Sequence, residues 1–381
     1  MNKTLAALQS YTKDFYSKTE FGESNIVGSP LGSWLLLASI ASNLDFSNNA
    51  TLKELTENSL HMKTEEAENA VKELLANYPA LNYVAQAWTV PDLSALPAVQ
   101  KWVEANTLIP YEGKIPSQEQ VDEWASTNTN DLIKEFPAQM NDATMLVIAN
   151  IIYSKLAWRT KFRAVPAQEA MKGWGVENVL NVVATHDILF CKNADNDIFA
   201  IYEVKAFGEN KESVRLVTCL SKEIKATELM EALTSVGALE SILPNDESLL
   251  ALSTDMYRVK EVKQGTSRIV VEANVPAWDA SSEHALMESA ELGYQHLAEA
   301  FREGSDGSFS VEAKQVAVAK FDKDGFEAAA LTTMMMSRSA MPRIVTQTVY
   351  ELNFTKPFVF VSFSDNLPMF SGYICKAKEG E

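Results

Sequence analysis

The order of sequence patterns along the chain constrains its fold more than any single motif. Helical periodicity dominates roughly the first 150 residues, as in TEEAENAVKELLANY, where Ala67, Val71, Leu74 and Tyr78 recur on one face. From about residue 144 β-branched residues become frequent, beginning with TMLVIANIIYSKLAW, which is predicted to form one long strand. Helices that come first, strands that follow and mixed connectivity predict an α+β fold.

No linker divides the sequence into separate domains. The 381 residues contain no internal repeat and no Gly/Ser-rich or Pro-rich linker, so we predict a single domain over residues 1–381. Two helical stretches are expected among the later strands, ATELMEALTSVGALESIL and EHALMESAELGYQHLAEAF. The second stretch would place His284 and His296 on one helix.

The net charge of −18 disfavours nucleic acid and anionic membranes as partners, because no surplus of basic residues is available to neutralise phosphates. No run of apolar residues is long enough to predict a membrane span. The N-terminal MNKTLAALQSYTKDFYSKTE lacks the continuous apolar core of a signal peptide. A cytoplasmic location is therefore favoured, and an extracellular one stays open if a leader has been removed.

Motifs of an enzyme or a metal site are missing from the sequence. G-x-S-x-G, G-x-G-x-x-G, P-loop and H-E-x-x-H patterns do not occur. The remaining candidates are His61, His186, His284, His296, Cys191, Cys219 and Cys375. The histidines show no i, i+4 pair and the cysteines form no C-x-x-C. We therefore predict no metal, no cofactor and no catalytic residue, and interpret the cysteines as buried, reduced thiols.

Four segments resemble the serpin family of protease inhibitors, in the family's order and spacing. They are NIVGSPLGSWLLLASIASN, TMLVIANIIYSKLAWRTKF, KFDKDGFEAAALTTMMMSRSAMP and FTKPFVFVSFSDNLPMFSGYI. The resemblance implies a monomer with three β-sheets, eight or nine helices and an exposed reactive-centre loop at about residues 325–344. It also implies that a target serine protease cleaves this loop and is trapped as an acyl-enzyme while the loop inserts into the central sheet.

The same resemblance assigns roles to individual residues. The hinge of the loop comprises Gly325, Phe326, Glu327, Ala328, Ala329 and Ala330. The shutter and breach regions comprise Ser29, Asn150, Trp158 and Gln315. Gln315 stands where many serpins have a histidine. Its amide can both donate and accept, so we expect a hydrogen-bond network around Ser29, Asn150 and Gln315.

The loop has the composition of a strand that can enter a sheet. A central strand must donate its ladder hydrogen bonds, and no proline occurs between Gly325 and Ala340; the first is Pro342. One face, which runs from Phe326 to Met336 in steps of two, carries no charge and could enter a core. Gly325 permits a sharp change of backbone direction at the hinge.

Phe326 is the main departure from an inhibitory hinge, which usually has a small residue there. A phenyl ring must find room in a packed core, so slower insertion is expected. Phe326→Thr is accordingly expected to lower the number of inhibitor molecules consumed per protease trapped. Phe326 also favours an alternative function, that of a non-inhibitory serpin: a cleavable substrate, a carrier or a storage-type binding protein.

The scissile bond has two candidate positions. A loop variant one residue shorter than the commonest would be cleaved at Arg338–Ser339, and the commonest spacing from the hinge glycine gives Ser339–Ala340. Arg338 favours trypsin-like serine proteases as targets, because a buried carboxylate in their specificity pocket pairs with a guanidinium group. Ser339 would favour elastase- or subtilisin-type proteases.

Overall fold

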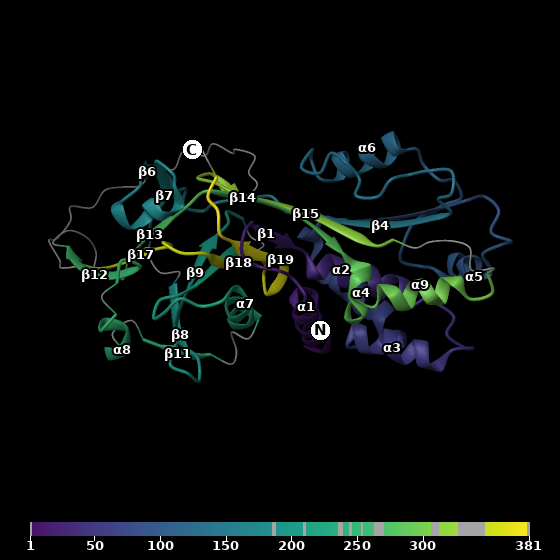
Figure 1. The fold of residues 1–381 in the computed structure, drawn as a ribbon, viewed down its shortest axis with the longest axis horizontal. Helices are drawn as coiled ribbons and strands as arrows, with labels where there is room; N and C mark the ends of the chain where they lie inside the picture. The colour runs from purple at the N-terminus through teal and green to yellow at the C-terminus, as the bar shows by residue number, and fades with distance from the viewer. Residues whose placement is uncertain are drawn as a thin grey trace. The chain divides into compact units, whose positions relative to one another are not determined.

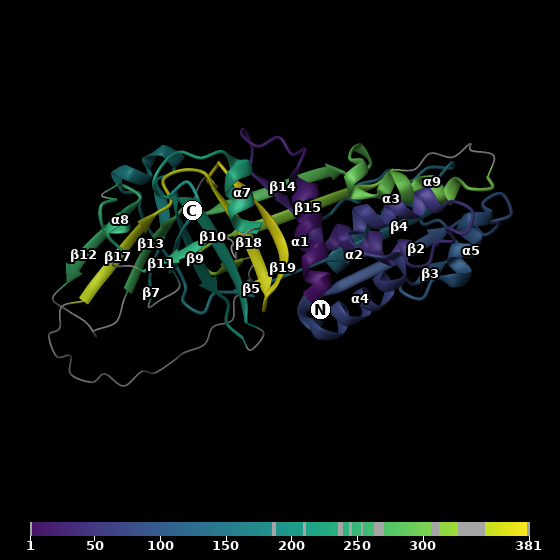
Figure 2. The ribbon, with the colours of Figure 1, turned by 90° about the horizontal axis from the view of Figure 1, so that it is seen from below.

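The computed structural model describes the following residues: 2–184, 188–208, 211–234, 239–243, 246–252, 254–262, 270–305, 312–326 and 347–378 (Figures 1 and 2). The chain divides into two compact units. One comprises Met1–Glu20, Gly28–Ser154 and Ser282–Val318, and the other comprises Phe21–Val27, Lys155–Ser281 and Ala319–Glu381. Each unit is assembled from separated stretches, so no single point in the sequence divides them. The single domain over 1–381 stays a prediction.

The first unit holds most of the described helices. They are α1 (Asn2–Tyr16), α2 (Pro30–Ala41), α3 (Ala50–Leu60), α4 (Thr64–Asn77), α5 (Pro97–Ala105), α6 (Gln118–Asn128) and α9 (Tyr294–Arg302). Helix α2 is buried along its whole length. It begins at Ser29, whose Oγ accepts the N–H of Gly32 at 3.1 Å. The Tyr11 hydroxyl lies 2.7 Å from Ser33 Oγ, and the Tyr294 hydroxyl donates to Ser33 O, so α1 and α9 are both tied to α2.

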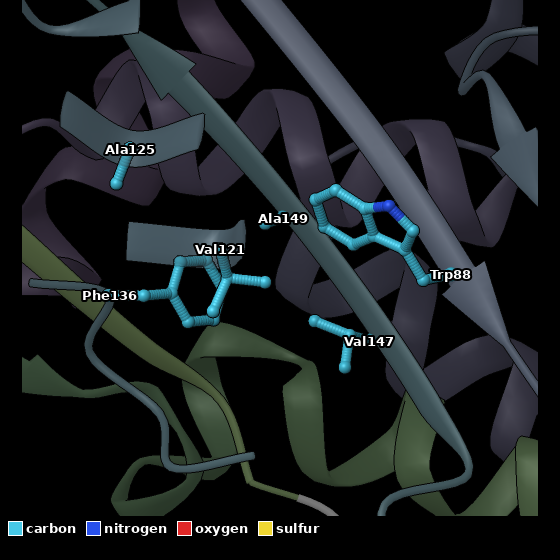
Figure 3. Packing of buried hydrophobic residues seen from close by; sticks show 6 residues of the cluster. All are labelled: Trp88, Val121, Ala125, Phe136, Val147 and Ala149. Carbon is cyan, nitrogen blue, oxygen red and sulfur yellow. The ribbon is translucent and has the colours of Figure 1, made fainter. Parts of the chain in front are cut away.

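A three-stranded sheet in the first unit packs under α6. Its order is β3 (Tyr111–Glu112), β2 (Tyr83–Thr89) and β4 (Leu146–Ile152). Figure 3 shows the apolar cluster between helix and sheet, which contains Trp88, Val121, Ala125, Phe136, Val147 and Ala149. Helix α6 begins with a capping box, in which Ser117 and Gln120 bond each other's backbone.

The second unit contains a seven-stranded sheet among its described residues. Its order is β1 (Ile26–Gly28), β19 (Leu367–Ile374), β18 (Phe358–Ser364), β10 (Glu212–Cys219), β9 (Ile198–Lys205), β8 (Ile188–Lys192) and β11 (Glu240–Ile242). Helix α7 (Ala226–Thr234) packs on β18 and β10. Gly372 lets β19 approach β1, because an added Cβ would lie 2.0 Å from Ile26 O.

Two further sheets complete the described strands. The five-stranded sheet has the order β12 (Tyr257–Val262), β17 (Gln347–Asn353), β13 (Val270–Val275), β7 (Asn178–Ala184) and β6 (Arg163–Pro166). The four-stranded sheet has the order β14 (Trp278–Ala285), β15 (Lys314–Phe321), β16 (Gly325–Phe326) and β5 (Leu156–Ala157). Short helices are α8 (Glu247–Leu250), η1 (Pro79–Leu81), η2 (Glu169–Trp174), η4 (Leu286–Glu288) and η5 (Ala290–Leu292).

The α+β class is confirmed, and within the described ranges the strands form four sheets and the chain forms nine α-helices. The stretch predicted as one long strand forms two, β4 and β5. Strand β4 ends at Ile152 because its partner β2 begins at Tyr83, the residue opposite, whereas β5 pairs with β16. The length of each strand is therefore limited by the length of the strand that pairs with it.

Two predicted helices were wrong in part. His284 lies on strand β14 and His296 on helix α9, and Gly293, with φ of 79°, separates the preceding turns from α9. The ESI at the end of the other predicted helix forms β11, because it pairs with Phe190 to Lys192 of β8. In both places a distant partner strand overrides a local helical preference.

Candidate functional site

The predicted hinge begins directly after a tight turn that closes on Asp322. The Asp322 carboxylate accepts the backbone N–H groups of Asp324 and Gly325 at 2.8 and 3.0 Å. The Asp322 N–H in turn donates to Gly325 O at 3.0 Å. An aspartate that bonds backbone two and three residues ahead stabilises a chain reversal. Asp322 is not among the residues predicted from the sequence, although its D-x-D-G pattern is a turn signal.

The reversal places the first two hinge residues in the four-stranded sheet as β16. Phe326 pairs with Phe321 of β15 on one side and with Leu156 of β5 on the other. Gly325 pairs with Ala157. Glu327, Ala328, Ala329 and Ala330, and the candidate scissile residues Arg338 and Ser339, lie outside the described residues, as does His186. The hinge is therefore already a strand over its first two positions.

The Phe326 side chain is buried in an aromatic cluster of the second unit. Only 3% of the residue is exposed, and its ring centroid lies 6.3 Å from that of Trp278 and 6.1 Å from that of Phe360. Trp278 is fully buried, lies 4.6 Å from Phe360 and stacks on Phe321 at 5.6 Å. The core around β16 thus accommodates the ring that the sequence marks as an obstacle.

Trp158, predicted for the breach region, holds the hinge turn from the other side. Its backbone N–H donates to Asp324 O at 3.0 Å, and its indole N–H donates to Asp322 O at 2.8 Å. Its ring lies 5.0 Å from that of Phe321. Lys161 pairs with the Asp324 carboxylate at 2.8 Å. Hydrogen bonds and an ion pair therefore join the turn to the residues that follow β5.

Ser29, Asn150 and Gln315 converge on the first turn of α2 in the first unit. The Ser29 N–H donates to Gln315 Oε1 at 2.8 Å, and Gln315 Nε2 donates to Ser29 O at 2.9 Å. Asn150 Nδ2 donates to Gly32 O at 2.7 Å. Strands β15 and β4 are thus both bonded to the start of this buried helix. Gln315 uses its donor and its acceptor together.

Replacing Gln315 tests the contribution of this reciprocal pair. Gln315→Ala should lower the free energy of unfolding by about 1–3 kcal/mol, because the part-buried N–H and C=O groups of Ser29 each lose one hydrogen bond. Denaturant unfolding measures the change, with Gln100→Ala on an exposed face of α5 as the matched control. Equal midpoints for the two variants would contradict the assigned role.

The remaining polar candidates do not assemble into a metal or membrane site. Among the residues that the structure describes, no three His, Cys, Asp or Glu side chains lie close enough to hold a metal ion. None of the helices in the described ranges is both long and apolar enough to cross a membrane. The cysteines are free; Cys191 and Cys219 are buried, and Cys375 is partly exposed. Burial raises the pKa of the Cys191 thiol to about 11.

Comparisons with known proteins agree with this architecture. The family model for serpin (serine protease inhibitor) matches residues 6–171. Antitrypsin of Bombyx mori is 25% identical over 255 residues, which cover 66% of this chain and 61% of that protein. Antichymotrypsin-2 of Bombyx mori is 25% identical over 256 residues, which cover 66% of this chain and 63% of that protein. The matches therefore span just over six-tenths of the length of these relatives.

Solved serpin structures share the fold along nearly the whole chain. Cleaved Serpin 42Da superposes with a TM-score of 0.67 at 14% identity, covering 100% of this chain and 98% of that one. The native thermophilic serpin tengpin superposes with a TM-score of 0.67 at 14% identity, covering 99% of this chain and 95% of that one. Serpin48 of the insect Tenebrio molitor superposes with a TM-score of 0.62 at 18% identity, covering 99% of each chain. The fold is thus that of a serpin, and the serpin family model matches residues 6–171 of the chain. Serpins are generally protease inhibitors rather than enzymes.

Proposed function

We propose that the protein is a serpin-type suicide inhibitor of trypsin-like serine proteases. The observation that carries this proposal is β16, where Gly325 and Phe326 already pair between β15 and β5. Lengthening β16 would require only that its existing backbone pairing with the strands on both sides continues along the sheet. The proline-free, apolar sequence that follows Phe326 suits that extension.

The proposed reaction begins as ordinary proteolysis. The protease serine attacks the carbonyl carbon of Arg338, the C–N bond to Ser339 breaks, and the released Ser339 amine takes a proton from the catalytic histidine. The Arg338 carbonyl is then held as an ester on the protease. The loop is now free at Arg338, so its N-terminal side extends β16 and carries the attached protease with it. Trapping requires this insertion to outrun hydrolysis of the ester.

The specificity assignment rests on Arg338. The relatives named antitrypsin and antichymotrypsin-2 match the chain at equal identity, so their names do not choose between protease classes. An arginine followed by serine fits the trypsin-type pocket, whose carboxylate pairs with guanidinium. Cleavage at Ser339–Ala340 by elastase- or subtilisin-type proteases is the other candidate.

Incubation of the protein with trypsin followed by a denaturing gel tests the proposal. We expect a stable band at the combined mass of the protein and trypsin, with its formation matched by loss of trypsin activity. Trypsin whose catalytic serine has been blocked should give no such band, because no ester can form. Complete cleavage of the loop with fully active trypsin would reject inhibition.

A non-inhibitory serpin is the second candidate, and the aromatic hinge favours it. Phe326 departs from the small residue usual in inhibitory hinges, and its ring holds the start of the loop in a buried cluster. In such a protein the loop would be cut without inserting. The cleaved form would then melt at the same temperature as the intact protein, whereas an inserted loop would raise the melting temperature.

A further inference from the structure

The residues that follow β5 run alongside the end of β9 in the second unit. Trp158 pairs with Ala206 in an antiparallel bridge. On one side of this bridge the Arg159 N–H donates to Lys205 O at 2.9 Å. On the other side the Phe207 N–H donates to the last carbonyl oxygen of β5 at 2.7 Å. Arg159 therefore lies opposite Lys205, and Phe207 lies opposite the last residue of β5.

This pairing separates a buried face from an outward face. Side chains alternate along a strand, so Trp158 and Ala206 point one way, and their neighbours on both segments point the other way. Trp158 is 3% exposed and Ala206 is 5% exposed, as expected of the buried face. On the outward face Phe207 is 58% exposed, Arg159 is exposed and Lys205 is partly exposed. A phenyl ring thus shares this surface with a guanidinium and an ammonium group.

Two more cations lie at the edge of this face. The Phe162 N–H donates to Lys323 O at 3.0 Å, which brings Lys323 of the hinge turn next to Arg163. Both of these side chains are exposed. Within the part of the chain that the structure describes, Arg159, Arg163 and Lys323 form no ion pair with a carboxylate. These positive charges are thus gathered on one surface of a chain whose net charge is −18.

Carboxylates on the same segments already have partners. Asp322 accepts two backbone N–H groups of its own turn, and Asp324 pairs with Lys161 at 2.8 Å. Glu203 of β9 pairs with Arg215 of β10 at 3.3 Å. An anionic partner that binds the unpaired cations would therefore not have to displace any of these interactions.

A second aromatic ring lies on the same face of the seven-stranded sheet. Ser213 of β10 is opposite both Lys205 of β9 and Phe363 of β18, and residues opposite one another share a face. The Arg215 guanidinium lies 4.3 Å from the centroid of the Phe363 ring. This ring is covered by a cation of the chain itself, whereas Phe207 is exposed.

We propose that Arg159, Lys205 and Phe207, with Arg163 and Lys323 at the edge, bind an acidic peptide segment that carries an aromatic or aliphatic side chain among its carboxylates. The guanidinium group fits a carboxylate through two parallel hydrogen bonds. The exposed phenyl ring provides apolar area that an aromatic or aliphatic side chain removes from water. Binding at this surface does not require cleavage of the loop.

A short peptide fits this surface better than a long polyanion. The field of exposed charges is screened over about 10 Å at 0.1 M salt, so a short segment on this surface is attracted mainly by the local cations. A long sulfated glycan or nucleic acid would extend beyond them and be repelled by the acidic remainder of the chain. Neither of those ligands uses an aliphatic or aromatic side chain to cover Phe207.

Fluorescence anisotropy with the labelled peptide DEDFEDD and the full chain tests the proposal. At about 50 mM salt, where surface charges are weakly screened, Arg159→Ala should weaken binding by about tenfold and Phe207→Thr by about fivefold. The peptide DEDAEDD should bind the unaltered chain about fivefold more weakly, and Phe207→Thr should not weaken it further. The matched control is Arg302→Ala on α9, which removes an unpaired positive charge from the first unit and should leave binding unchanged.

Two results would overturn the proposal. One is equal affinity of DEDFEDD for the unaltered chain, Arg159→Ala and Phe207→Thr, or no binding to any of them. The other is tighter binding of a heparin hexasaccharide that depends on Arg159 but not on Phe207, which would identify a glycan site. Denaturant unfolding checks that each variant is folded, and Lys323→Ala, on an exposed turn, should weaken binding by about threefold if Arg159→Ala does not fold. Trapping of trypsin enters none of these measurements, so their outcome is independent of the proposed function.

Discussion

Arg338→Ala should lower the rate at which the protein traps trypsin by about 10⁴-fold, the scale of discrimination lost when a site built for a charged partner meets one without it. The guanidinium group at this position would otherwise pair with the carboxylate at the base of the protease pocket. The second-order rate of trypsin inactivation measures the change directly.

Arg343→Ala is the matched control for this prediction, because it removes the same charge from the same segment a few residues further on. Its rate of trypsin inactivation should equal that of the unaltered protein. Trapping that survives Arg338→Ala but fails with Arg343→Ala would refute the assignment. Inhibition of elastase with an unchanged rate in Arg338→Ala would instead identify Ser339–Ala340 as the reactive bond.

Phe326→Thr should lower the free energy of unfolding of the intact protein by about 3 kcal/mol, because it removes a buried ring and leaves a cavity against Trp278 and Phe360. Phe207→Thr is the control, since Phe207 lies in the same unit but is 58% exposed. Denaturant unfolding should show little change in that variant. Equal destabilisation by the two substitutions would contradict the role given to the cluster.

The same variant separates two views of the hinge. From the sequence, the ring is an obstacle to insertion, and removing it should lower the number of inhibitor molecules consumed per protease trapped. The ring is already buried in the intact chain, so insertion carries no further packing cost at this position. We therefore expect the stoichiometry of inhibition by Phe326→Thr not to fall, and titration against trypsin measures it. A clear fall in the number of inhibitor molecules consumed per protease trapped would show that the ring is an obstacle to insertion.

Much of the fold can be read from local patterns. The capping box at Ser117 and Gln120 and the start of α2 at Ser29 depend on neighbours three residues away, so both can be recognised in one sequence. The α+β class follows from the order of helical and strand patterns. The hinge and the network around Ser29 are predictions from motifs that resemble those of serpins, and the structure shows what Phe326, Trp158 and Gln315 contact.

Only the tertiary structure determines which strands pair with one another. Alternation of apolar residues marks a strand and its faces, but it carries no information about which distant strand pairs with it. For that reason the break after Ile152, the strand position of His284 and the burial of Phe326 beside Trp278 were not predicted. The placement of β12 outside β17 has the same origin, because Lys260 and Glu351 are separated by many residues and meet only when the sheet forms.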